Sequence, residues 1–378
     1  MAVAEISAKQ LHDKVDSGEA VFILDVRNSE DYSDWKIEHK HLTDINIPYF
    51  DFLDDNEEIY TSLPKDTEIV VVCAKGGSAK MVAEMLDERG YRVGYLTEGM
   101  QEWSQFYQPV TVVDEKDMKI IQVNRLAKGC LSYMMISDGK AMVVDPGRHY
   151  EEYIKLAEQE QAQIMHIMDT HLHADHISGG PGLAKHTGAV YHISRSEMQG
   201  SEAIAYEALE DEQQIQVGDV KVKVLSIPTP GHTPGSVSFL VEDRYLLSGD
   251  TIFVGGLGRP DLGGKAREWA QSLYDTVFTH IANMSDETLV LPTHYADIKE
   301  INEQGVVGAY LGEIRANNEV MRTQDRAKFT DMVAGAAGAT PPNYEDIIKI
   351  NRGDMQVPLD VATTLEIGPN RCAVHHAD

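Results

Sequence analysis

The sequence predicts an α/β protein of two domains, a parallel-sheet domain followed by a two-sheet sandwich, and three observations carry this prediction. The chain has 378 residues, and domains of ~100–200 residues make about two from this length. Up to about residue 107, apolar runs of strand length alternate with helical segments, which is typical of a parallel sheet covered on both faces. Beyond residue 117, several strands precede each helix, and the repetition of this order favours two sheets packed face to face with helices outside.

Four segments are expected along the chain. Residues 1–107 form the first domain, and residues 108–116 form a short, charged connection that contains Pro109. Residues 117–300 form the second domain. Residues 301–378 form a C-terminal extension of helices and tail that packs on the second domain.

Composition limits the partners and the compartment. A net charge of -28 argues against nucleic acid or an anionic membrane as partner, because both bind clustered Lys and Arg. The three cysteines are far apart and odd in number, which is no disulfide framework. The chain shows no signal peptide and no run near the ~18 apolar residues of a membrane span. We expect a cytoplasmic protein, and the sequence leaves its oligomeric state open, a homo-oligomer included.

In the first domain, strands and helices alternate. Ser7 is a suitable N-cap for the first helix, and Gly90 closes the helix that begins at Ser78. Strands are expected at residues 20–26, 45–48, 68–73 and 91–96, and helices at residues 6–15, at residues 78–89 and from residue 100 onward.

Cys73 is the candidate reactive residue of this domain. It ends a buried strand, directly before a glycine-rich turn and a helix start. The N–H groups of such a turn and the positive end of the helix favour the thiolate, the nucleophilic form. Lys75 adds positive charge, and Gly76, Gly77 and Ser78 complete a cradle around the sulfur. An inert, buried cysteine is the alternative, and the double glycine favours the reactive thiol.

The first hundred residues resemble a single rhodanese (sulfurtransferase) domain. The resemblance rests on residues 24–27, the Cys73 loop and residues 96–103. It implies that Cys73 carries sulfur as a persulfide. The family usually has an arginine five residues after the cysteine, where this chain has Ser78. The loss of that arginine argues against thiosulfate as sulfur donor but leaves the cradle in place.

In the second domain, apolar strands again set the framework. A turn at residues 137–139 joins two strands into a hairpin. Strands are expected at residues 118–123, 130–136, 140–144, 162–169, 190–193, 236–241, 245–250 and 288–294, with a hairpin pair within 214–227 and helices at residues 150–161 and 182–186.

Ligand-type side chains gather at the ends of these strands. Three histidines and two aspartates fall within residues 169–176, among them His171, His173, Asp175 and His176. Neutral imidazole and carboxylate are the ligands of zinc and iron. His232, Asp250 and His294 also follow closely on apolar strands. Asp250 alone indicates only a turn and His294 only a cap, but together with the histidine loop they predict a metal site at one edge of the sandwich.

These positions resemble the ligand motifs of the metallo-β-lactamase superfamily one by one, over about residues 117–300. The motifs are His-x-His-x-Asp-His at residues 171–176, Gly-His-Thr at 231–233, Gly-Asp-Thr at 249–251 and Pro-Thr-His at 292–294. In dizinc members the resemblance implies one site from His171, His173 and His232, and another from Asp175, His176 and His294, with Asp250 bridging.

Two features narrow the chemistry within a fold that hosts many reactions. Residues 255–262 and the tail segments 341–344 and 368–372 resemble persulfide dioxygenases and their glyoxalase II-like relatives. The fusion agrees, since a rhodanese handles persulfide sulfur and a persulfide dioxygenase oxidises it.

The resemblance to persulfide dioxygenases implies one Fe(II) per chain, held by His171, His232 and Asp250, with positions left open for O₂ and substrate. The remaining groups of the cluster would then orient these ligands: His173, Asp175, His176 and His294. The sequence keeps every ligand of both arrangements, so zinc stays open.

We therefore expect oxidation of a small thiol persulfide, such as glutathione persulfide, by O₂ to sulfite and thiol, coupled to sulfur transfer at Cys73. Arg259, Tyr295 and Arg315 are candidates for binding the carboxylates of the carrier. The main alternative is a zinc-dependent, glyoxalase II-like thioester hydrolase with an attached sulfurtransferase or sulfur-carrier domain. A second alternative is a rhodanese domain that serves only as a docking module. The identity of the thiol carrier stays open.

Overall fold

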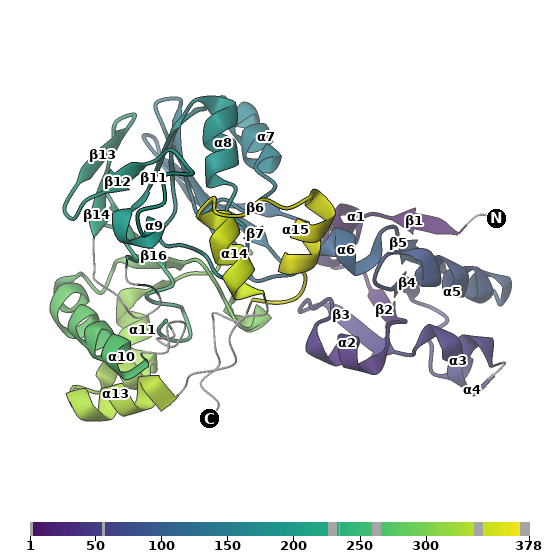
Figure 1. Cartoon of the computed structure of the whole chain (residues 1–378). Helices are drawn as coiled ribbons and strands as arrows, with labels where there is room; N and C mark the ends of the chain where they lie inside the picture. Colours follow the sequence, from purple (N-terminus) through teal and green to yellow (C-terminus); the bar gives the residue numbers. More distant parts are fainter. Residues whose placement is uncertain are drawn as a thin grey trace. The chain divides into compact units, whose positions relative to one another are not determined.

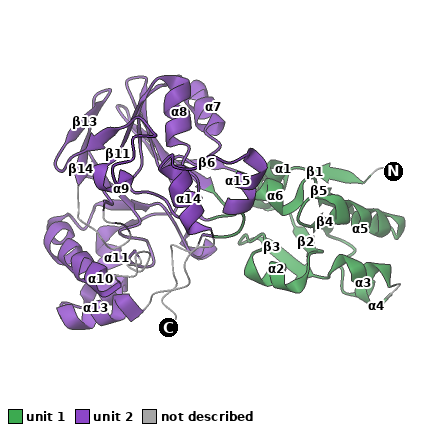
Figure 2. Cartoon of the chain, in the orientation of Figure 1, with its two compact units in different colours: residues 1–106, 125–128, 367–369 green, residues 107–124, 129–366, 370–378 purple. Residues whose placement is uncertain are grey.

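A computed structural model describes residues 3–54, 57–225, 233, 235–258, 266–335 and 343–370. The chain splits into two compact units, coloured separately in Figure 2. The first unit comprises residues 1–106, 125–128 and 367–369, and the second comprises residues 107–124, 129–366 and 370–378. Within the described ranges, no helix has the length and apolar character needed to cross a membrane.

The first unit is a five-stranded sheet in the order β1-β5-β4-β2-β3, and its strand pairs are parallel. The predicted parallel α/β architecture is therefore confirmed. Its strands are β1 (Ala4–Ile6), β2 (Val21–Asp25), β3 (Leu42–Asn46), β4 (Glu68–Val72) and β5 (Val93–Leu96). Its helices are α1 (Ala8–Asp16), α2 (Ser29–Asp34), α3 (Tyr49–Leu53), α4 (Glu58–Thr61), α5 (Gly77–Glu88) and α6 (Gly99–Trp103).

The central strand β4 is apolar on both faces because both faces are covered. Ile69 and Val71 belong to the core that includes residues of α5, whereas Val70 and Val72 belong to the core that includes residues of α1 and α6. The loop that follows the carboxyl end of β4 begins with Cys73.

The second unit holds two mixed sheets, seen in Figure 1 between outer helices. The seven-stranded sheet has the order β12-β11-β10-β9-β8-β7-β6, and the six-stranded sheet runs from β13 to β18 in chain order. Strands of the first sheet are β6 (Gln108–Asp114), β7 (Lys119–Arg125), β8 (Cys130–Ser137), β9 (Lys140–Val144), β10 (Gln163–Met168), β11 (Val190–Ser194) and β12 (Glu207–Leu209). Strands of the second are β13 (Gln214–Val217), β14 (Val220–Leu225), β15 (Ser238–Val241), β16 (Tyr245–Gly249), β17 (Leu289–Pro292) and β18 (Ala309–Tyr310).

Three cores define the layers of this unit. One lies between the sheets and includes Met142 from the first and Phe239 from the second. Another lies between the seven-stranded sheet and the helices α7 (Glu151–Gln159) and α8 (Gly180–Thr187). The third lies between the six-stranded sheet and the helices α10 (Ala266–Asp275), α11 (Leu311–Asn317), α12 (Glu319–Arg322) and α13 (Arg326–Gly335). The predicted αββα sandwich is therefore confirmed. Further α-helices in the described part of this unit are α9 (Arg195–Met198), α14 (Tyr344–Asn351) and α15 (Leu359–Glu366). A π-helix, η1 (Thr276–His280), and two 3₁₀ helices, η2 (Ile281–Asn283) and η3 (Ile298–Glu300), accompany them.

The segment expected as a connection, residues 108–116, contains strand β6, which pairs antiparallel with β7. Pro109 fits there because β6 is the outermost strand of its sheet, and an edge strand tolerates a residue that has no N–H to donate. Val110 and Val112 are half-buried and alternate with the exposed Pro109 and Thr111, which is the pattern of a half-buried strand rather than of a linker.

Candidate functional site

The histidine loop follows β10, and we call residues 169–178 the metal loop. His171, His173, Asp175 and His176 are each at most 3% exposed. β10 is a central strand that pairs in parallel with β9 and β11. The metal loop therefore lies at the end of the sheet where the carboxyl ends of these three strands meet. Titratable groups this deeply buried need partners or an ion.

The structure brings two residues of the other sheet against this loop. Asp250 follows β16 and His294 follows β17, and these strands are parallel neighbours. His294 Nδ1 lies 2.7 Å from Asp250 Oδ1, and its Nε2 lies 3.1 Å from Asp175 Oδ2. His171 Nε2 lies 3.7 Å from Asp250 Oδ2. Ligand-type groups from both sheets therefore meet in one buried cluster.

Two expected members of the site, His232 and Arg259, lie outside the described residues, as does Cys372. Their places in the site stay predictions. Thr233, the neighbour of His232, is described, and its hydroxyl lies 2.7 Å from that of Ser236.

Asp145, which follows β9, organises the metal loop, although no sequence pattern had assigned it a role. Its Oδ1 accepts a hydrogen bond from the Thr170 N–H at 2.7 Å, and its Oδ2 accepts one from the Thr293 hydroxyl at 3.1 Å. These two threonines directly precede His171 and His294. Asp145 directly follows an apolar strand, as His171, Asp250 and His294 do closely. This shared position is the signal that could have identified it.

Asp145 also sets the tautomers of two histidines. His173 Nε2 lies 3.1 Å from Asp145 Oδ1, so this nitrogen carries the proton and donates it. His173 Nδ1 then holds a lone pair, and it is buried without a hydrogen-bond partner among the described residues. The Thr170 hydroxyl donates to Asp145 Oδ2 at 2.9 Å and lies 2.9 Å from His171 Nδ1, so it accepts from that nitrogen. Both imidazoles thus keep a basic nitrogen for a metal ion.

The charges of the cluster are strongly coupled. Burial opposes ionisation of Asp175, but the imidazoles of His294 and His176 outweigh it and hold the pKa of Asp175 well below its usual range. Burial likewise opposes protonation of His176, but Asp175 outweighs it and raises the pKa of His176 to about 10. Carboxylates in this cluster therefore attract cations, and a metal ion would compete with protons for the same atoms.

Cys130, the first residue of β8, is a further group in this cluster and was not predicted from the sequence. Its Sγ lies 3.2 Å from Asp175 Oδ2 and 3.9 Å from His176 Nδ1. Its backbone bridges to His294. Cys130, Asp175, His176 and His294 offer ligand atoms that all lie within 4.8 Å of one another. The donor set fits a zinc or iron ion by chemistry and by spacing.

Two of the expected substrate-binding residues are engaged elsewhere. Tyr295 is 5% exposed, and its hydroxyl donates to Asn124 Oδ1 at 3.3 Å. Arg315 ion-pairs with Asp286 and donates to the backbone carbonyl of Met284 at 3.2 Å. These bonds tie Tyr295 into the core and Arg315 to its own surroundings, so we do not retain them as carboxylate binders.

Cys73 lies in the loop between β4 and α5, and we call residues 73–79 the sulfur loop. Its Sγ accepts the N–H of Gly76 at 3.1 Å and the N–H of Ala79 at 3.3 Å. Gly76 has φ +86°, and a Cβ there would come within 1.9 Å of the Thr97 carbonyl oxygen. Glycine is therefore required, and the backbone donors it provides stabilise negative charge on the sulfur.

The other residues of the sulfur loop do not contact Cys73 through their side chains in the described hydrogen bonds. Lys75 and Gly77 are exposed and Ser78 is half-buried. Negative charge on this sulfur is therefore stabilised by the backbone N–H groups of Gly76 and Ala79.

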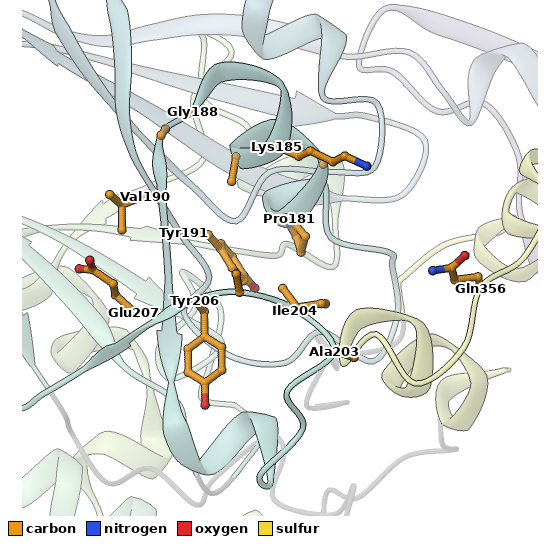
Figure 3. A pocket seen from close by; sticks show the side chains of 14 residues that line it. Pro181, Lys185, Gly188, Val190, Tyr191, Ala203, Ile204, Tyr206, Glu207 and Gln356 are labelled. Carbon is orange, nitrogen blue, oxygen red and sulfur yellow. The ribbon is translucent and has the colours of Figure 1, made fainter.

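A separate cleft of about 800 Å³ lies beside α8 and β11. Figure 3 shows Pro181, Lys185, Tyr206, Glu207 and Gln356 around it. No residue of the metal loop lines it within the described chain. We assign it no part in the reaction.

Two family models match the chain. Residues 126–294 match the metallo-beta-lactamase superfamily, and residues 7–106 match the rhodanese-like domain. A solved metallo-beta-lactamase from Staphylococcus aureus has 30% sequence identity and a TM-score of 0.58, and the match covers 64% of this chain and 74% of that chain.

Relatives with two different activities resemble part of this chain. The mitochondrial persulfide dioxygenase ETHE1 of Bos taurus is 28% identical over 172 residues, which is 44% of this chain and 65% of that protein. The cytoplasmic hydroxyacylglutathione hydrolase of Arabidopsis thaliana is 29% identical over 219 residues, which is 56% of this chain and 80% of that protein. Sequence identities of 28% and 29% do not distinguish the two activities. The geometry of the site is needed for that.

Proposed function

The chain belongs to the metallo-β-lactamase superfamily and carries a rhodanese-like domain, and from this premise we propose that it is a persulfide dioxygenase with a sulfurtransferase domain. Its substrate is a low-molecular-weight thiol persulfide, such as glutathione persulfide. One observation carries the proposal: a cysteine cradled by backbone donors and a buried group of candidate metal ligands that includes His171 and Asp250 occur in one chain. Persulfide sulfur links the chemistry of both.

The reaction balances with O₂ and water. The outer sulfur of the persulfide is oxidised and gains both atoms of O₂, which is reduced. Water supplies the third oxygen of sulfite. The sulfur–sulfur bond breaks, and the inner sulfur leaves as the thiol with a proton.

One Fe(II) would be held by His171, His232 and Asp250, where it supplies open positions for O₂ and sulfur and the electrons that activate O₂. His171 Nε2 and Asp250 Oδ2 lie 3.7 Å apart, so both atoms are near enough to hold one ion at ligand distances of ~2.1 Å. The proton on His294 Nδ1 anchors the other oxygen of Asp250, which keeps that carboxylate oriented.

Cys73 would exchange sulfur with the products or the substrate. A Cys73 persulfide can pass its outer sulfur to sulfite, with the old sulfur–sulfur bond broken and thiosulfate formed. Transfer of the same outer sulfur from Cys73 to a thiol carrier, with the sulfur–sulfur bond broken and the Cys73 thiolate released, would instead supply the substrate. The Gly76 and Ala79 N–H groups support either step because they stabilise the sulfur anion that leaves.

A zinc-dependent thioester hydrolase is the second candidate function. The cluster of Cys130, Asp175, His176 and His294 favours it, since a second ion there would create a dinuclear centre of the hydrolase type. Bound zinc would lower the pKa of water for attack on a thioester carbonyl.

Metal analysis of protein purified without added metal, with product assays on two substrates, separates the candidates. The dioxygenase proposal expects one iron per chain, sulfite from glutathione persulfide and no hydrolysis of a hydroxyacyl-glutathione thioester. Two zinc ions per chain with thioester hydrolysis would refute it.

A Cys73→Ser variant tests the sulfur-transfer half. We expect more sulfite and less thiosulfate from this variant, with persulfide oxidation retained. An unchanged distribution of sulfur products would leave the rhodanese-like domain only a docking role.

A further inference from the structure

The C-terminal extension contacts the metal loop through two buried side chains. Asn351, the last residue of α14, is 5% exposed, and Glu366, the last residue of α15, is 1% exposed. Neither is among the candidate ligands. Burying an amide and a carboxylate is costly unless each is fully bonded, so their partners identify what the two helices hold.

The Asn351 amide gives all its described hydrogen bonds to the metal loop. Its Nδ2 donates to the carbonyl oxygens of His173 and His176, both at 2.9 Å. Its Oδ1 accepts the N–H of Ser178 at 2.9 Å. The orientation of the amide follows from these partners, because carbonyls need a donor and an N–H needs an acceptor. The turn that contains His173 and His176 is closed around one side chain.

Glu366 joins the metal loop to the loop of Asp145. Its Oε1 accepts the N–H of Ile177 at 2.8 Å, and its Oε2 pairs with Arg148 Nε at 2.7 Å. Arg148 lies three residues after Asp145, whose carboxylate sets the tautomer of His173. Glu366 therefore helps to fix the distance between the carboxylate and the imidazoles that depend on it.

Apolar packing supports the same contact. Ile177 of the metal loop forms a small core with Ile347 of α14 and Ala362 of α15, and each of the three is at most 7% exposed. The two helices thus hold the loop by packing as well as by hydrogen bonds.

We propose that Asn351 and Glu366 are positioning residues of the metal centre, through which α14 and α15 set the backbone of the metal loop and so its affinity for a metal ion. The inference needs metal binding by the loop but not persulfide chemistry. Groups that orient ligands in this way typically change metal affinity ~10–100-fold when they are lost.

Three variants separate positioning from general stability. Asn351→Asp keeps the shape and the acceptor for Ser178 but turns a carboxylate oxygen toward two carbonyls. Glu366→Gln keeps an acceptor for the N–H of Ile177 and is the conservative variant. Asn318→Ala is the matched control: Asn318 is 8% exposed and caps α12 by accepting the Met321 N–H at 3.1 Å, with no bond to the metal loop.

The experiment measures Co²⁺ affinity, the visible absorption spectrum of the Co²⁺-loaded protein, amide hydrogen exchange in the metal-free protein and the unfolding midpoint. Asn351→Asp should weaken Co²⁺ binding at least about 10-fold, change the spectrum and speed exchange at residues 173–178. Glu366→Gln should lie between it and the wild type. Asn318→Ala should lower only the midpoint.

The inference fails if Asn351→Asp lowers the midpoint as Asn318→Ala does while Co²⁺ affinity, spectrum and loop exchange stay as in the wild type. If Asn351→Asp does not fold, Glu366→Gln decides by the same measurements, and wild-type values would overturn the proposal. A wild type that binds Co²⁺ in the predicted way but does not oxidise persulfide when loaded with iron would contradict the proposed function alone.

Discussion

Replacing Asp145 by asparagine should weaken metal binding and leave the protein folded. The carboxylate accepts the N–H of Thr170 at 2.7 Å, and His173 Nε2 lies 3.1 Å from the same oxygen. In Asp145→Asn, the amide oxygen can keep both donors. The amide nitrogen then faces the hydroxyls of Thr170 and Thr293, where Asp145 Oδ2 accepts at 2.9 and 3.1 Å.

Tautomers explain the expected effect on the metal. A Thr170 hydroxyl that accepts from the new amide turns its own proton toward His171 Nδ1, which lies 2.9 Å away. His171 must then carry its proton on Nε2, the atom that faces Asp250. Loss of an orienting partner of this kind costs ~10–100-fold in metal affinity.

The stability change separates this variant from a truncation. Asp145→Asn weakens bonds to a charged acceptor into neutral ones, a loss of about 1–2 kcal/mol. Asp145→Ala leaves two buried N–H donors, of Thr170 and His173, without an acceptor, which costs about 2–6 kcal/mol at ~1–3 kcal/mol each. The truncation should therefore lose stability and metal binding together.

Competition with a calibrated chelator gives the metal affinity, and urea unfolding of the metal-free protein gives the stability. Asp25→Asn is the control, since Asp25 is equally buried but pairs with Arg27 in the first unit. Asp25→Asn should lower stability without changing metal affinity. Wild-type metal affinity in Asp145→Asn would refute the reasoning from tautomers.

Three further predictions follow from single sites. Gly76→Ala should slow alkylation of Cys73 and sulfur transfer at least about 10-fold, because the loss of one hydrogen bond to a charged group costs ~1.5–3 kcal/mol. Gly90→Ala is the control and should lose stability alone, since Gly90 has φ +78° and a Cβ there meets no atom within 4 Å. Equal alkylation rates in the two variants would contradict this prediction. Burial, and secondarily a neighbouring imidazole, lower the pKa of His192 to about 4, below the ~6.5 of an unfolded histidine. The folded state favours neutral His192, so its contribution to stability is complete above about pH 6.5 and is lost as the pH falls toward 4; urea midpoints against pH should decline less steeply in His192→Gln, and parallel curves would exclude this origin. We expect that Cys130 is not a metal ligand, so Cys130→Ser should keep one iron per chain. The Co²⁺-loaded wild type should likewise show no thiolate-to-cobalt charge-transfer band. Loss of metal from the variant would instead make Cys130 a ligand.

Local sequence was enough to predict the frame of both sites. The sulfur loop and the metal loop each follow an apolar strand, and their candidate residues are close in sequence, so the position after a strand end singled out Cys73 and His171 as candidates. Asp250 and His294 were found because each repeats the pattern of an apolar strand followed by a ligand-type residue.

The supporting residues depend on pairings that the sequence does not reveal. Asp145 reaches His173 because β9 and β10 are parallel neighbours, and Cys130 joins the cluster because its backbone bridges to His294. Asn351 and Glu366 act on the metal loop across 173 or more residues of chain, as the bonds to Ser178 and Ile177 show. No periodicity encodes such contacts.

The strand β6 illustrates a different limit. A proline and several charges between two domains usually indicate a linker, yet Pro109 lies in an edge strand because only one side of that strand needs hydrogen bonds. Whether a segment lies at an edge is a property of the whole sheet.

Oxygen consumption on glutathione persulfide tests the central claim most directly. The iron-loaded protein should consume one O₂ for each persulfide sulfur that it oxidises, with sulfite and thiosulfate together equal to the O₂ consumed, and Asp250→Asn should abolish consumption. Absence of O₂ uptake by protein that contains one iron per chain, with hydrolysis of a glutathione thioester in its place, would contradict it.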